Sequence, residues 1–173
     1  MGKINFSRAI IAGLVAGIVG DLLGFLVNGL LLAPQWADGM RALGHGDFSS
    51  NEWIWFNLLG LVSGIVTIWI YAAIRPRFGT RVKTAVYAGV AVWILSVLIP
   101  NVSFMGVAGL FPPQLIVMTT AGGLVEVIGG AIAGAAIYKE LARRANPLQV
   151  DRYRGVQARQ QTSLHGHFIA SQR

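Results

Sequence analysis

Four long apolar runs, separated by short polar segments, dominate the pattern of hydrophobic and polar positions. They cover approximately residues 9–33, 54–74, 84–107 and 115–138. A transmembrane helix needs about 20 mostly apolar residues to cross a hydrocarbon core roughly 30 Å thick. Because each run meets this requirement and short connections join antiparallel neighbours, the pattern predicts an all-α, up-down bundle of four membrane-spanning helices.

The composition supports a membrane location. Hydrophobic residues make up 54% of the chain and charged residues only 12%, whereas a soluble domain is roughly 25% charged. The 22 glycines suit helices that pack closely in lipid. Cysteine is absent, which excludes disulfide bonds and thiolate metal ligands.

The cations predict the orientation, because Lys and Arg are retained preferentially on the cytoplasmic side of a membrane. Among the 14 cations, Arg41 alone falls in the segment between the first two runs, beside Asp38, Asp47 and Glu52. All the others precede the first run, join the second to the third, or follow the fourth. We therefore expect both termini in the cytoplasm. Topology also explains the net charge of +7, so no nucleic-acid partner is implied.

The chain divides into a four-helix transmembrane domain, residues 1–140, and a basic cytoplasmic tail, residues 141–173. The tail loses hydrophobic periodicity and is rich in Arg, Gln and Ser. A solvated extension attracted to anionic lipid headgroups explains it more simply than a dedicated docking element does.

An internal repeat relates the two halves of the transmembrane domain. Residues 60–74 align without a gap on residues 123–137, with seven of fifteen positions identical. The first and third runs match more faintly, with Ala9, Ala12 and Gly13 aligned on Ala85, Ala88 and Gly89. This pattern is typical of a duplicated helical hairpin whose copies cross the membrane in the same direction.

Asp21 and Glu126 are the ionisable side chains deep inside the apolar runs. Each lies thirteen residues from a cytoplasmic cation, Arg8 or Lys139, which corresponds to about 20 Å at 1.5 Å per residue. Both are therefore expected near the middle of the membrane. Each also lies on a helix stripe of small residues suited to close helix contacts. The glycines expected to pack between helices are Gly13, Gly17, Gly24, Gly60, Gly64, Gly122 and Gly130.

The apolar runs contain no Lys, Arg or His that could neutralise these acids. Burial disfavours an ionised carboxylate, and two close carboxylates do not both ionise readily. We therefore expect the pair to share a proton, with further hydrogen bonds from Asn28, Ser63 and Thr67.

Three interpretations of the acidic pair stay open. The acids could hydrogen-bond across helices and fix the register of the bundle. They could form a proton or cation pathway, or pair with a helix of a partner protein. The first and third favour a non-catalytic structural, accessory or assembly subunit. The second favours a small proton- or cation-linked transporter or channel that works as an oligomer, because four spans are few for a transporter.

Catalytic and metal chemistry find little support in the sequence. His45, Asp47 and Glu52 share a predicted outer loop, but three donors without tight ligand spacing are common by chance. No catalytic constellation is recognisable. We expect no metal, no cofactor and no enzymatic activity, with membrane lipids, further copies or a larger membrane complex as partners.

Several segments resemble a group of small bacterial four-span membrane proteins that has no assigned activity. They are Ala12 to Gly17 followed by an acid, Val27 to Pro34, Tyr71 to Gly79, Gly123 to Glu126 and Ile137 to Glu140. The resemblance covers about residues 5–140. It implies a bacterial cytoplasmic (inner) membrane and carries over no catalytic residue or cofactor.

Overall fold

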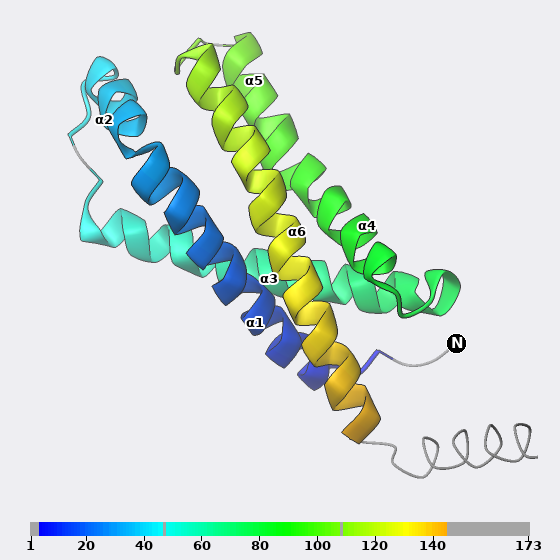
Figure 1. Ribbon diagram of the computed structural model, residues 1–173. Coiled ribbons are helices and arrows are strands. Elements are labelled where there is room, and N and C mark those ends of the chain that lie inside the picture. Colours follow the sequence, from blue (N-terminus) through cyan, green and yellow to red (C-terminus); the bar gives the residue numbers. More distant parts are fainter. Residues whose placement is uncertain (1–3, 47, 108, 145–173) are drawn as a thin grey trace, which may run out of the picture. The chain divides into compact units, whose positions relative to one another are not determined.

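The computed structural model describes residues 4–46, 48–107 and 109–144, and these residues form helices and no strands. The expected all-α fold is confirmed. Two segments, η1 and η2, are wider π-helical stretches inside longer helices. The elements in chain order are α1 (Phe6–Gly24), η1 (Phe25–Leu31), α2 (Ala33–Ala42), α3 (Ser50–Phe78), α4 (Val82–Trp93), η2 (Ile94–Leu98), α5 (Ile99–Val107) and α6 (Pro113–Arg144) (Figure 1).

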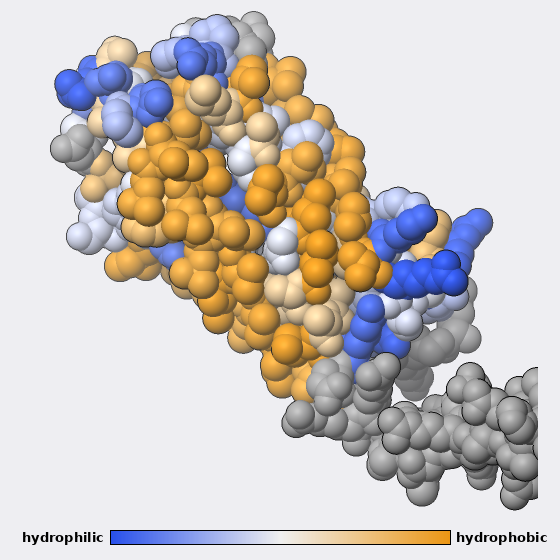
Figure 2. All heavy atoms as spheres, viewed as in Figure 1, coloured by the Kyte–Doolittle hydropathy of each residue, from blue (hydrophilic) through white to orange (hydrophobic). Residues whose placement is uncertain are grey.

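Four helical segments of the described residues are long and apolar enough to cross a membrane. They are Phe6–Leu31, Ser50–Phe78, Val82–Phe104 and Pro113–Lys139. Exposed apolar side chains cover the visible face between hydrophilic ends, one over α2 and the other over the turn between α3 and α4 (Figure 2). The chain is therefore a multi-pass membrane protein built as a helical bundle.

The segment expected as an outer loop, Pro34 to Trp53, contains a helix instead. Pro34 lies in the first turn of α2, where a missing backbone N–H costs nothing. Gly39 packs against the Phe111 ring on one face of α2, and Asp38 and Arg41 form an ion pair on the exposed face (2.7 Å). The apolar runs did not reveal α2 because it is short and amphipathic.

Helix α3 is longer than its apolar run because polar residues stabilise its ends. At the start, the Ser49 hydroxyl accepts from the Glu52 backbone N–H, and the Glu52 carboxylate accepts from the Ser49 backbone N–H, a capping box. At the other end, the helix continues through Pro76 and stops at Gly79, whose φ of 82° favours glycine.

Small residues let α1 pack closely between α3 and α6. A Cβ atom at Gly13 would lie 2.5 Å from Ile65 Cα, and one at Gly64 would overlap the backbone of Gly17. On the other side, a Cβ atom at Gly130 would lie 2.5 Å from the Ala16 carbonyl oxygen. In lipid, such close backbone approach favours association through van der Waals packing.

Equivalent contacts recur in the two halves of the bundle. In the register of the repeat, Gly13 and Ile65 correspond to Gly89 and Ile128, and each glycine packs on its isoleucine. The same register aligns Gly60 with Gly123 and extends to align Asp21 with Val97. Gly60 packs on the Asp21 side chain, and Gly123 packs on the Val97 side chain. The two hairpins therefore share part of their packing as well as part of their sequence.

Residues Met1–Tyr138 form one compact unit, and the chain beyond Tyr138 is not part of it. Helix α6 continues to Arg144, past the expected start of the tail at residue 141, and residues 145–173 of that tail lie outside the described part. In the first unit, Tyr71 and Tyr138 are buried against each other edge to face, with 0% and 7% exposure. They belong to the core of the bundle.

Candidate functional site

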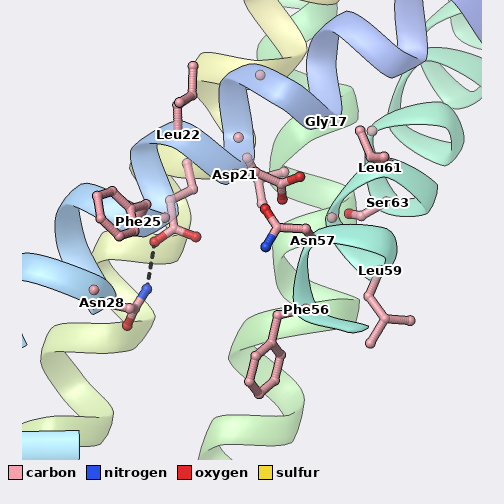
Figure 3. Close-up of a pocket in the computed structure, with 18 of the residues that line it drawn as sticks. Gly17, Asp21, Leu22, Phe25, Asn28, Phe56, Asn57, Leu59, Leu61 and Ser63 are labelled. Carbon is pink, nitrogen blue, oxygen red and sulfur yellow. Dashed lines mark hydrogen bonds between the residues drawn. The ribbon is translucent and has the colours of Figure 1, made fainter. Parts of the chain in front are cut away.

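A cavity of about 1060 Å³ lies between the helices of the first unit. Residues of α1, η1, α2, α3, η2 and α6 line it, and both acids, Asp21 and Glu126, are among them. Figure 3 shows part of the lining, with Asp21 labelled. Its volume is slightly above the roughly 300–1000 Å³ typical of small-molecule sites. The sequence placed the acids at similar depth but did not predict this space.

Asp21 projects from α1 toward α3. Its carboxyl group packs on Gly60, where a Cβ atom would overlap the carboxyl oxygen Oδ1. In Figure 3 the Asp21 carboxyl group and the Asn57 side chain point into the space between these helices. None of the hydrogen bonds among the described side chains involves Asp21. This acid is therefore available to a group that enters the cavity.

Glu126 projects from α6 toward η1 and has several polar neighbours. Its carboxyl group packs on Gly24, with Oε2 lying 3.2 Å from where a Cβ atom would be. Asn28 Nδ2 donates to Glu126 Oε1 (3.0 Å). Asn28 Oδ1 in turn accepts from Trp36 Nε1 (3.2 Å) and from the Thr119 hydroxyl (3.4 Å). This chain of bonds connects α2, η1 and α6.

The backbone of η1 helps to place this network. Asn28 lies in the middle of the π-helical stretch, where the wider turn changes the angle at which a side chain leaves the helix. Wide turns of this kind frequently occur at functional sites. The position of Asn28 is thus set by a backbone feature that hydrophobic periodicity does not indicate.

The predicted hydrogen bonds of the acids are only partly as expected. Asn28 bonds to Glu126, but the Thr67 hydroxyl donates to the Ser63 carbonyl oxygen within α3 (2.8 Å). Ser63 and Thr67 line the cavity without bonding to either acid. Within the described part of the chain, no hydrogen bond joins the two carboxyl groups. The structure therefore contains no direct bond through which they would share the expected proton.

Trp36 and Asn57 are cavity residues that the sequence reasoning missed. Trp36 follows Asn28 by eight residues, a spacing that places two residues on one face of a continuous helix. That spacing was a usable signal, although Leu32 ends η1 between them. The sequence around Asn57 gave no such signal. In the structure, the Asn57 side-chain amide lines the cavity and donates to the Trp53 carbonyl oxygen in its own helix (2.7 Å).

The cavity is closed toward the turn between α3 and α4. There the helices pack into a core of small and aromatic residues that includes Ala12, Ile68, Tyr71 and Ala88, all 0% exposed. At the rim of the cavity, Ile18, Leu22 and Leu59 are 52%, 61% and 61% exposed. These apolar side chains face the lipid-exposed surface, so the route past them is apolar.

The lining, as the structure describes it, contains two carboxyl groups and no Lys, Arg or His. Among the residues described, no three His, Cys, Asp or Glu side chains gather into a metal-ligand group. Of the loop residues considered for a metal, Glu52 bonds Ser49 and Asp47 lies outside the described residues. Among the described residues, the cavity therefore holds two carboxyl groups without an opposing cation.

Comparison of the chain with protein families, with curated proteins and with solved structures found no match.

Proposed function

We propose that this protein is a non-catalytic membrane transporter, in which Asp21 and Glu126 bind a proton or a cation inside the helix bundle. The observation that carries the proposal is the cavity of about 1060 Å³, which holds both acids and, among the described residues, no cationic side chain. Charged groups within membrane helices are costly, so their presence on a cavity wall favours a role in an ion pathway.

The two acids have different surroundings, which supports different roles. Asp21 has no hydrogen-bond partner within the described part of the chain, so it is the acid that an incoming proton or cation meets. Glu126 is held by Asn28 (3.0 Å) and positions the second charge. The core that closes one end of the cavity favours a carrier that opens to one side at a time over a continuous channel.

The location and orientation belong to the same proposal. The resemblance to bacterial four-span proteins supports a bacterial cytoplasmic membrane, and the distribution of the cations supports cytoplasmic termini. In this orientation the packed core that closes one end of the cavity lies toward the cytoplasm, beside the basic turn between α3 and α4. An oligomer of several copies would supply the helices that a transporter of this size lacks.

A structural or assembly role is the second candidate, and the bond between Asn28 and Glu126 favours it. Hydrogen bonds between membrane helices contribute on average about 0.6 kcal/mol. A role limited to stability does not require a cavity or an unpartnered Asp21. These two features therefore favour transport.

The test is ion flux through purified protein in liposomes that enclose a pH-sensitive dye, with a membrane potential imposed. Proton flux should exceed that of empty liposomes and fall at least to about a tenth in Asp21→Asn and in Glu126→Gln, since each loses one charge of the pathway. Asp38→Asn and Glu52→Gln make the same chemical changes outside the cavity and should retain the flux. Wild-type protein no faster than empty liposomes would contradict transport.

A further inference from the structure

We propose that the cavity binds an amphipathic organic cation, with the positive group beside Asp21 and Glu126 and the apolar body against the aromatic wall. The inference rests on the proposed function, in which these acids receive a cation, and names the chemical class of the ligand. Three observations carry it: the charge of the lining, the aromatic residues around it and the size of the space.

The charge of the lining selects for cations. Two carboxyl groups project into the cavity from α1 and α6, and no Lys, Arg or His of the described residues lines it. An acid in a membrane interior is costly without an opposing charge. A cation between the helices supplies that charge, whereas the lining, as far as the structure describes it, offers no positive side chain to an anion.

An aromatic wall lies between the acids and the α2 end of the bundle. Trp36 and Phe56 both pack edge to face on Phe48, with ring centroids 6.4 and 5.6 Å apart, and Trp53 packs on the same ring (6.0 Å). All four line the cavity. Aromatic faces attract cations and bury apolar ligand surface, so this wall suits an amphipathic cation better than a small inorganic ion.

The size and the remaining chemistry favour an organic ligand over a tightly held metal ion. The space of about 1060 Å³ is far larger than a bare ion needs, and drug-sized ligands occupy sites of roughly 300–1000 Å³. No third acid or His joins Asp21 and Glu126 among the residues described. The exposed apolar rim at Ile18, Leu22 and Leu59 also fits entry of an amphipathic molecule from the lipid.

The experiment compares two probes of matched size and shape and opposite charge, radiolabelled tetraphenylphosphonium and tetraphenylborate. Binding is measured by equilibrium dialysis on the full chain in lipid nanodiscs. Tetraphenylphosphonium should bind saturably, and its affinity should fall roughly tenfold in Asp21→Asn and in Glu126→Gln, because each variant removes one opposing charge. Asp38→Asn and Glu52→Gln should bind it like the wild type.

The outcomes separate this inference from the proposed function. Equal binding of both probes, or cation binding unchanged in both cavity variants, would overturn the ligand class. If tetraphenylphosphonium shows no saturable binding while the dye detects proton flux, the proposed ligand class is wrong and proton transport is still supported. Charge-selective binding without flux would support the ligand class and contradict transport. Circular dichroism of each variant confirms that its helices are intact.

Discussion

Two glycines leave space for the acidic side chains of this bundle. Gly60 lacks the Cβ atom that would overlap Asp21 Oδ1, and Gly24 leaves room for the Glu126 carboxyl group. The space that accommodates each acid is thus created on the neighbouring helix. Both glycines were expected to pack between helices, and the structure adds that they pack on the acids themselves.

We expect Gly64→Ala to destabilise the protein by about 1–3 kcal/mol, the usual cost of an overpacked site. The new methyl group would overlap the backbone of Gly13 and Gly17, which cannot move aside as a flexible side chain can. Unfolding in sodium dodecyl sulfate, followed by circular dichroism, measures the change. Gly46→Ala is the control, because its Cβ atom would meet open space. Equal stability of both variants would contradict the close contact.

The sequence predicted the acids but not their partners, and the reason is physical. A charged residue within an apolar run is conspicuous in the sequence itself, so Asp21 and Glu126 could be identified and placed at similar depth. The bond from Asn28 to Glu126 joins residues 98 positions apart, and its geometry depends on how α6 packs on η1. Such pairing is decided by the tertiary fold. The hydroxyl groups of Ser63 and Thr67 were equally plausible partners.

At the scale of the element, helix ends and irregular turns carry information that hydropathy does not. The predicted spans were correct in number among the described residues and shorter than the helices. The capping box at Ser49 extends α3 before its apolar run begins, and η1 and η2 widen two helices without a change in polarity. Helix α2 was missed because ten residues are too few to form a span.

We expect Ser49→Ala to loosen the first turn of α3 at a cost of about 1 kcal/mol, typical of a lost N-cap. The Ser49 hydroxyl accepts from the Glu52 backbone N–H (3.4 Å), and no other described group replaces it. Hydrogen exchange of the amides of Asn51, Glu52 and Trp53 should accelerate. Ser50→Ala removes a hydroxyl one residue later and should leave exchange unchanged. Equal protection in both variants would show that the cap is dispensable.

At the scale of the whole molecule, two similar hairpins carry different acids. Asp21 occupies the position that Val97 has in the second hairpin, and Glu126 occupies the position of Ser63 in the first. Each hairpin therefore contributes one acid, from a different helix of the repeat. The shared contacts of Gly60 and Gly123 support the duplication that the sequence indicated, while the exchange of residues makes the charge distribution asymmetric.

The orientation can be tested with single cysteines, because the natural chain has none. In intact bacterial cells that express the protein, a membrane-impermeant maleimide should label Ala42→Cys and leave Thr80→Cys unlabelled, since basic segments stay in the cytoplasm. Both positions are exposed in the structure. Permeabilised cells should label both variants. Labelling of Thr80→Cys alone in intact cells would show that the topology is the opposite of the proposed one.

The bond between Trp36 and Asn28 has an optical consequence. It places an indole ring in the wall of the cavity, one side chain away from Glu126. Indole emission shifts in wavelength with the polarity around the ring, so a molecule that displaces water or breaks this bond changes the colour of the emitted light. Trp36, one of five tryptophans in the chain, is thus an intrinsic fluorophore whose emission changes, without an attached label, when the cavity is filled.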